Sequence, residues 1–267
     1  MGFFLVMRAE VTRSFIIMRR YWFATIISLV VGYGFMMSLI YAFMYNKDAA
    51  TKIADQATSG ALGFILGLFS FGIIGMFSQG MQSMARSGEL EQVCMSPHGL
   101  VGNFLARSLV GAISSIISLA LLLTLIAYTV KGKLHADPVP TFVCLALTYV
   151  NLIGFGFMTG GLVLVFKQIG QLMTLFRLAL IFLVTTATTT DLMSSQSPLL
   201  IVAHLLPALD AGVCLKAVLL DGIGMDVFTH TSMYWLIFNS ALWTIVGITG
   251  FKYMENVSRD KGTLGVY

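Results

Sequence analysis

The sequence predicts an all-α integral membrane protein that crosses the bilayer about six times. Of its 267 residues, 57% are hydrophobic and only 10% are charged, and the mean hydropathy is +0.88. A typical soluble chain carries roughly 25% charged residues. The apolar residues also fall into long uncharged runs, which match the ~20 residues that a helix needs to span a ~30 Å hydrocarbon core. We therefore expect a single transmembrane domain over residues 1–267.

The first 20 residues have the pattern of an interfacial "elbow" helix over residues 3–20. Bulky apolar residues recur there at helical spacing, and arginines occupy the opposite face. A cleaved signal peptide is the alternative, but the next apolar run is too long for such a peptide and has no small-residue cleavage site. The apolar residues are Phe3, Phe4, Met7, Val11, Phe15 and Met18, and the basic ones are Arg8, Arg13, Arg19 and Arg20.

Six apolar runs follow, separated by charged or proline-containing loops. The second run contains a Gly63-xxx-Gly67 pair, a spacing that lets helix backbones approach closely in lipid. This pair could pack within one subunit or form a dimer face. The expected spans are 22–45, 60–80, 104–130, 141–166, 168–190 and 232–251.

Residues 196–222 differ from these runs. Their apolar pieces are too short to cross a membrane and are broken by Pro207, Asp210 and Lys216. Pieces of ~10–14 residues are typical of re-entrant or interfacial helices. We expect short helices at the outer surface between spans five and six.

The positive charges predict the orientation, because cytoplasmic loops carry an excess of Lys and Arg. With the N-terminus inside, the inner side has 11 of them and the outer side has 5, which favours both termini in the cytoplasm. The inner set is Arg8, Arg13, Arg19, Arg20, Arg86, Arg107, Lys167, Arg177, Lys252, Arg259 and Lys261, and the outer set is Lys47, Lys52, Lys131, Lys133 and Lys216.

Few side chains inside the spans suggest chemistry. Arg177 is the clearest charge at depth, ~12–15 Å beyond Lys167 at 1.5 Å per residue, and an intramembrane Arg is a functional candidate by default. It could instead snorkel to the inner interface, or span five could begin later. Thr185 and Thr189 could offer hydroxyls to a substrate or bond their own helix. Gln79 completes the candidates for a pathway or gate.

Several function classes find no support in the sequence. The basic residues are scattered, so no nucleic-acid surface is predicted. Cys94, Cys144 and Cys214 have no metal or redox spacing, the four histidines are isolated, and no paired carboxylates or nucleophile–base pair appear within the spans. The sequence also lacks a G-x-x-x-x-G-K-[S/T] loop for ATP phosphates. We expect no cofactor, no metal and no enzymatic site in this chain.

The polar segment 82–99, between spans two and three, has two interpretations. It could be a loop that keeps its charges in water, or a short helix over 83–97 that docks on another protein. The sequence favours the helix, because Ser83–Met95 is helix-compatible and Pro97 would end it.

This segment resembles the coupling helix of ABC-2 type transporter permeases. The family pattern runs from a charged residue through Gly and a Leu-Glu pair to Ser/Thr-Pro, and this chain matches it at Gly88, Leu90, Glu91, Ser96 and Pro97. Glu89 and Cys94 depart from the pattern, as does the outer segment, which lacks the family's frequent Asn-Pro. The elbow helix, the six spans and the outer helices also fit the family.

The resemblance implies a permease subunit in the bacterial cytoplasmic membrane. It would pair with a second permease, the same or a homologous chain, and with separate ABC ATPase subunits that bind ATP and Mg. It would export a hydrophobic or amphipathic substrate such as a drug, an antibiotic or a lipid. A polysaccharide-exporting ABC permease and a secondary transporter are the alternatives. The implied coupling residues are Arg86, Gly88, Glu89, Leu90, Glu91, Ser96 and Pro97.

Overall fold

The computed structural model describes residues 2–44, 50–95, 99–132, 134–135, 137–166, 169–190 and 199–260, and these residues contain helices and no strand. The helices follow one another as α1 (Gly2–Arg20), α2 (Trp22–Met44), α3 (Ala50–Ser87), α4 (Glu89–Cys94), α5 (Gly99–Val130), α6 (Pro138–Val165), α7 (Gly170–Thr189), α8 (Leu199–Leu205), α9 (Leu209–Leu219), the 3₁₀ helix η2 (Gly224–Thr229) and α10 (Thr231–Asp260).

Five of the described helices, α3, α5, α6, α7 and α10, are long and apolar enough to cross a membrane. The count rises to six when α1 and α2, which meet at a bend of 76°, are taken together as one broken span. The predicted all-α, multi-pass membrane architecture is therefore confirmed. The length and composition of these helices identify the chain as a multi-pass membrane protein.

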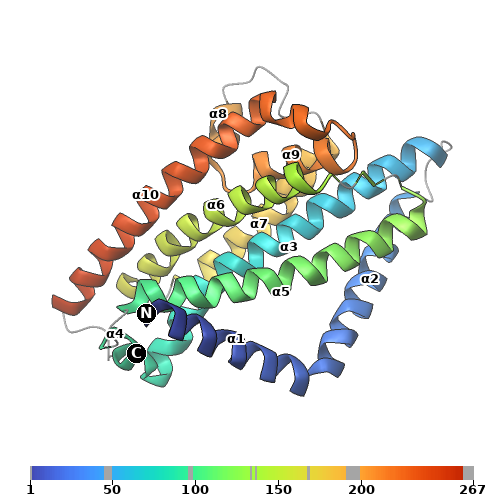
Figure 1. Ribbon diagram of the computed structural model, residues 1–267. Coiled ribbons are helices and arrows are strands. Elements are labelled where there is room, and N and C mark those ends of the chain that lie inside the picture. Colours follow the sequence, from blue (N-terminus) through green and yellow to red (C-terminus); the bar gives the residue numbers. More distant parts are fainter. Residues whose placement is uncertain are drawn as a thin grey trace.

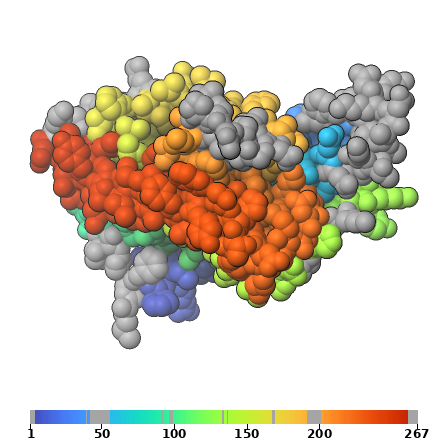
Figure 2. Space-filling view, turned by 90° about the horizontal axis from the view of Figure 1, so that it is seen from above, coloured from blue at the N-terminus to red at the C-terminus, as the bar shows by residue number. Residues whose placement is uncertain are grey.

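The long helices run between two ends of a bundle (Figure 1). The short helix α4 lies at one end, together with the start of α1 and the last turns of α10, and α8 and α9 lie at the opposite end. Seen from above, α10 extends along the molecule beside the α8–α9 region (Figure 2). We call these the α4 end and the α9 end.

Small residues allow the central helices to pack closely. Gly154 of α6 and Gly247 of α10 face each other's helix backbone, so that a Cβ atom on either would collide with main-chain atoms. In lipid, where apolar side chains gain little by leaving the solvent, close backbone approach of this kind drives helix association. Beside this contact a cluster of aromatic rings fills the core, formed by Phe77, Phe104, Phe157 and Phe251.

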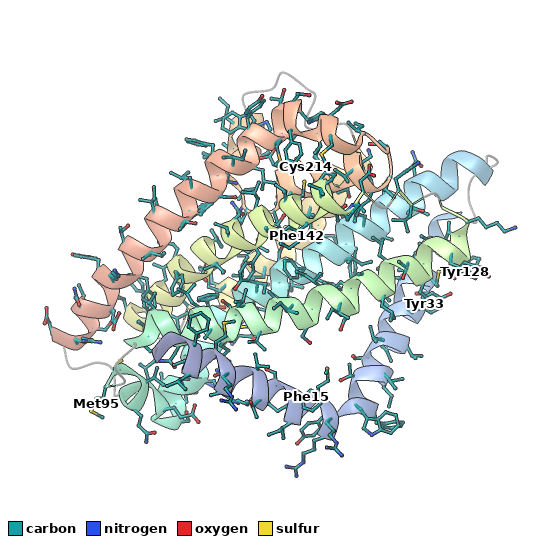
Figure 3. All side chains as sticks on the ribbon, in the orientation of Figure 1. Phe15, Tyr33, Met95, Tyr128, Phe142 and Cys214 are labelled. Atoms are coloured by element: carbon teal, nitrogen blue, oxygen red, sulfur yellow. The ribbon has the colours of Figure 1, made fainter. Side chains whose placement is uncertain are left out.

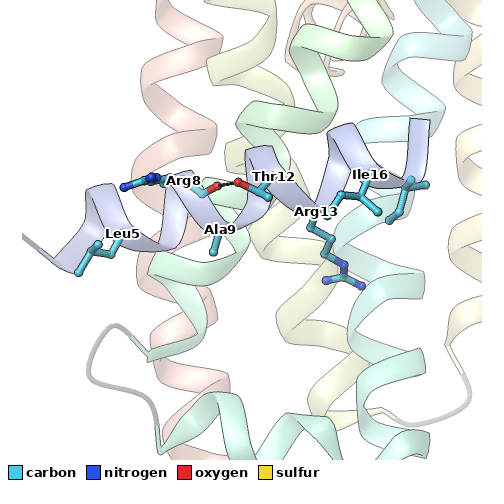
Figure 4. A pocket seen from close by; sticks show the side chains of 7 residues that line it. Leu5, Arg8, Ala9, Thr12, Arg13 and Ile16 are labelled. Atoms are coloured by element: carbon cyan, nitrogen blue, oxygen red, sulfur yellow. Dashed lines mark hydrogen bonds between the residues drawn. The ribbon is translucent and has the colours of Figure 1, made fainter. Parts of the chain in front are cut away.

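Helices α1 and α2 lie at the side of the bundle (Figures 1 and 3). The helix α1 runs across the other helices and contacts α5, and Phe15 projects away from the bundle. A hydrogen bond of 2.9 Å between the hydroxyls of Tyr33 and Thr129 links α2 to α5. A shallow pocket follows α1 (Figure 4), but all its lining residues come from that helix, namely Leu5, Arg8, Ala9, Thr12, Arg13, Ile16 and Ile17.

The helix bounds differ from the predicted spans mainly where polar residues extend a helix beyond its apolar part. Residues 50–59 and 252–260 lie outside the expected spans but belong to α3 and α10, respectively. The reason is that backbone hydrogen bonding continues through polar residues, whereas hydropathy follows only the apolar stretch. Helix α6 begins at Pro138, before the expected start at 141, and proline is tolerated in a first turn.

Candidate functional site

The candidate site lies where α3 packs against α7. Four glycines of α3 face this helix: Gly60 lies against Thr189, Gly63 against Thr185 and Thr188, Gly67 against Ile181, and Gly75 against the Arg177 guanidinium. A Cβ atom on Gly67 would approach the Cα atom of Ile181 to 2.8 Å, which is too close for the two helices to keep their separation. In this chain the Gly63-xxx-Gly67 pair therefore serves packing within the subunit.

Arg177 is enclosed in this contact, with only 1% of its surface exposed. Its Nη1 donates a hydrogen bond of 3.2 Å to the carbonyl of Phe71 on α3. Its Nη2 donates to the Thr174 hydroxyl at 3.0 Å and its Nε to the Met173 carbonyl at 3.3 Å. The Phe71 ring lies below the guanidinium carbon, 4.3 Å from the ring centroid, within the range of a cation–π contact.

Gly75 makes this arrangement possible. The Phe71 carbonyl lies one turn before Gly75 on α3, and the missing Cβ leaves room for a second donor beside the helix's own N–H group. The ion pairs of the described residues do not include Arg177. The charge is therefore accommodated by backbone carbonyls, a hydroxyl and an aromatic face.

The position of Arg177 bears on the two alternatives predicted for it, namely snorkelling to the inner interface and a later start of span five. It is seven residues into α7, which places its Cα ~10 Å along the helix. The guanidinium is buried against α3 instead of reaching an aqueous interface, so the structure does not support snorkelling. Span five does begin slightly later than predicted, at Gly170 in place of 168.

The other predicted pathway residues lie in different surroundings. Gln79 is exposed, and its Oε1 and the Arg177 Nη1 both lie beside Gly75. Thr185 and Thr189 are two and three turns further along α7. The Thr185 hydroxyl donates to the Ile181 carbonyl at 2.7 Å and that of Thr189 to the Thr185 carbonyl at 2.9 Å. Both hydroxyls thus bond their own helix, as the second of the two sequence interpretations proposed.

The segment expected to form a coupling helix over 83–97 is not one helix. Helix α3 continues to Ser87, the chain turns at Gly88 with φ of +75°, and α4 begins at Glu89. Only glycine adopts this φ without strain, which explains the break. Arg86, Gly88 and Glu89 are exposed, as is Met95, whereas Leu90 is fully buried in the core. The Glu91 side chain and residues Ser96 and Pro97 lie outside the described residues.

Sequence reasoning missed a buried polar cluster at the α9 end, which we call the α9-end polar cluster (Asn151, His204, Asp210 and Asn239). His204 Nδ1 and Asp210 Oδ1 are 2.8 Å apart. The Asn151 Oδ1 accepts a hydrogen bond from the backbone N–H of Ala208, and the Asn239 amide donates to the carbonyls of His204 and Leu206. A signal was present, because single Asn residues interrupt otherwise apolar runs at 151 and 239.

The structure also brings together two cysteines that are 70 positions apart in the sequence. Cys144 of α6 and Cys214 of α9 are both buried, and their thiols are neighbours. This contact and burial raise the pKa of Cys214 above its usual range, so its thiol stays protonated. No metal-binding group of three or more His, Cys, Asp or Glu residues is found in the described part of the chain.

Comparison with known proteins assigns no family: no protein-family model matches the chain, and no curated protein matches it.

Proposed function

We propose that the chain is the permease subunit of an ATP-binding cassette exporter, driven by ATP hydrolysis in a separate ATPase subunit. The observation that best supports this function is the exposed break between α3 and α4, at the end of the bundle where the resemblance to ABC-2 permeases is also found. Arg86 and Glu89 are exposed on the two sides of Gly88, where a partner protein can contact them.

The burial of Leu90 suggests how such a contact would act on the bundle. Leu90 is 0% exposed and belongs to the hydrophobic core, while its neighbour Glu89 faces out. A force applied to the exposed side chains would therefore be transmitted to the helices through Leu90. For ATP to bias the permease, the docking contacts must differ between the nucleotide states of the ATPase.

Helix α3 provides the path from this break to the rest of the bundle. It is a single helix of 38 residues, about 57 Å long at 1.5 Å per residue. It packs against α5, α6 and α7, and it holds Arg177 through the Phe71 carbonyl. We therefore assign Arg177, with Gln79 beside it, to gating, in which a shift of α3 relative to α7 would change the contacts of the buried cation.

The distribution of charge supports placing the α4 end in the cytoplasm. Basic residues lie there at the end of α3 and in the last turns of α10, and α1, which starts there, is also basic, as the positive-inside rule requires. In this orientation both termini are cytoplasmic and the α8–α9 unit is outside. The lightly charged spans favour a hydrophobic or amphipathic cargo, carried with a second permease subunit in a bacterial inner membrane.

A secondary transporter is the alternative that a specific observation favours, because such proteins often carry charged groups deep in the membrane, as Arg177 is here. The two mechanisms differ in their energy source. An ABC permease needs ATP and a partner with a phosphate-binding loop, whereas a secondary transporter needs only an ion gradient.

Copurification and a charge reversal test the proposal. We expect the chain, purified from native membranes, to retain a P-loop ATPase whose hydrolysis it stimulates. Glu89→Arg should reduce that stimulation and transport, since it reverses an exposed charge at the proposed docking point. Asp260→Arg is the matched control, because it reverses an exposed carboxylate at the end of α10.

Two results would overturn the proposal. One is transport by the purified chain alone in vesicles, driven by an ion gradient without ATP. The other is full stimulation by the Glu89→Arg complex under conditions in which the complex is intact.

A further inference from the structure

The α9-end polar cluster joins the short helices α8 and α9 to the bundle. Asn239 of α10 holds the carbonyls of His204 and Leu206 at 3.0 and 3.1 Å, and Trp243 of the same helix donates to the Leu205 carbonyl at 2.9 Å. From α6, Asn151 accepts from the N–H of Ala208, a residue with φ of +68°. The turn between α8 and α9 is thus held from two sides by uncharged side chains.

At the centre of the cluster is a carboxyl–imidazole pair. His204 is 5% and Asp210 1% exposed, and the Trp235 ring stacks on the imidazole at 4.7 Å with an interplanar angle of 7°. A nitrogen and an oxygen held at 2.8 Å need a hydrogen between them, since two lone pairs at this distance would repel. That hydrogen is either the N–H of a neutral imidazole, which leaves Asp210 as a carboxylate and the pair with one negative charge, or a proton on the carboxyl group, which leaves the pair neutral. A further proton on the neutral pair would leave a net positive charge in a buried site.

The other carboxyl oxygen indicates where this proton is. Asp210 Oδ2 is buried and accepts no hydrogen bond from the described residues. A buried carboxylate with one oxygen unpartnered is much more costly than a protonated carboxyl group in the same place. We therefore place the proton on Asp210 Oδ1, which donates it to His204 Nδ1.

We propose that His204 and Asp210 bind one proton between them, and that this proton holds the α8–α9 unit onto α6 and α10. Loss of the proton to solvent leaves one negative charge in the buried pair. The unit can then relieve the cost of that charge only by moving toward water. The α9 end would therefore loosen in response to alkaline pH, whatever the chain transports.

The pKa values agree with this arrangement. Burial raises the pKa of Asp210 to about 8 and lowers the pKa of His204. The pair is therefore neutral near pH 7, with its proton on the carboxyl group, and it becomes negative above about pH 8.

The neighbouring groups leave this titration to the pair. Cys214, one turn beyond Asp210 on α9, keeps its proton, and behind it is the thiol of Cys144 on α6. Lys216 is six residues beyond Asp210, ~9 Å along α9. Uncharged side chains face the pair or its helix from α6, α10, α7 and α3, namely Asn151, Asn239, Trp235, Val184, Thr188 and Leu66. At the far end of α9 are His135 near Gly222, and Asp226 and His230 of the η2 segment.

The test uses the purified full chain in lipid nanodiscs. Infrared spectra should show a buried protonated carboxyl at pH 7 that disappears as the pH passes about 8. Amide protection factors in 199–220, corrected for the intrinsic pH dependence of exchange, should fall between pH 6.5 and 8 by up to about tenfold per pH unit.

The Asp210→Asn variant tests whether the fall in protection comes from ionisation of Asp210, because the asparagine amide can donate to His204 Nδ1 but cannot ionise. We expect pH-independent protection in this variant. Asp221→Asn, the same change at an exposed position just after α9, should behave like the unmodified chain.

Protection in the unmodified chain that stays constant from pH 6.5 to 9 would overturn the proposal, and so would an equal fall in the Asp210→Asn variant. The infrared titration of the unmodified chain decides the question without any substitution: absence of a buried protonated carboxyl at pH 7 refutes the proposal even if Asp210→Asn does not fold.

Discussion

Adding one methyl group at Gly75 would show how much the hydrogen bonding of the buried Arg177 contributes to the free energy of unfolding. A Cβ atom on Gly75 would occupy the space of the Arg177 Nη1 atom, whereas a Cβ atom on Gly72, one turn earlier in α3, has no atom within 4 Å. Gly75→Ala and Gly72→Ala are therefore the same change in the same helix, and they differ in whether the guanidinium must move.

The expected magnitudes follow from two opposing terms. Each Gly→Ala change in a helix interior gains up to about 1 kcal/mol of helix propensity. In Gly75→Ala the guanidinium also loses its bond to the Phe71 carbonyl, and a hydrogen bond to a charged group contributes about 1.5–3 kcal/mol. We therefore expect Gly75→Ala to be less stable than Gly72→Ala by about 1.5–3 kcal/mol.

The assay is reversible unfolding of the two purified variants in mixed micelles, with the free energy of unfolding extrapolated to the absence of denaturant. Gly72→Ala should match or exceed the unmodified chain. Equal stability of the two variants would refute the reasoning, because it would mean that the bond between Arg177 and Phe71 contributes nothing to holding α3 and α7 together.

Four further predictions rest on the same structure. Gly67→Ala should lower the free energy of unfolding by about 1–3 kcal/mol, measured by denaturant titration, because its Cβ atom would lie 2.8 Å from the Ile181 backbone. Arg177→Met should retain the fold at least as well as Arg177→Lys in thermal melts. The methionine side chain needs no hydrogen-bond partners, whereas the lysine ammonium cannot reproduce the three hydrogen bonds of the guanidinium. Trp243→Phe should cost about 1 kcal/mol of stability, through loss of the bond to the Leu205 carbonyl. Between pH 6.5 and 8 the free energy of unfolding should fall by up to about 1.4 kcal/mol per pH unit, because the folded chain keeps the Asp210 proton and the unfolded chain does not; a flat profile there contradicts the assignment.

The sign of the pH effect follows from the direction of each shift. The folded pKa of Asp210 is raised, so the stability that this group contributes is present at low pH and is lost as the pH rises through about 8. The folded pKa of His204 is lowered from 6.5, so its contribution is lost as the pH falls below 6.5. Above pH 6.5 only the Asp210 effect remains, which is why the fall is expected there.

The membrane architecture was predictable because it depends on hydropathy over ~20 residues, a property that each segment carries by itself. Packing of the Gly63-xxx-Gly67 face was predictable in kind, since small residues at this spacing permit close approach. The helix that packs against this face was not predictable, because nothing in either segment encodes that α7 lies opposite α3. The helix break at Gly88 was also missed, because the pattern over 83–97 is helical on both sides of the glycine and only the backbone angle shows the turn.

The buried polar groups were the hardest to predict. Arg177 stood out because a charge in an apolar run is rare, but its acceptors are main-chain carbonyls, which every residue has. His204 and Asp210 are six residues apart around Pro207, and no helical or strand spacing brings such residues together. Their contact depends on the turn that Asn151 and Asn239 hold, and these come from helices almost 90 residues apart in the sequence.

The α9-end polar cluster also has a consequence for biosynthesis. Asn239 and Trp243 are on α10, which leaves the ribosome after the other described helices, while Asn151, His204 and Asp210 are made earlier. Until α10 enters the bilayer, the carbonyls of His204, Leu205 and Leu206 lack the donors that they have in the finished protein. A chain halted or truncated before α10 would therefore leave these carbonyl groups without their donors, a defect that membrane quality-control proteases could detect.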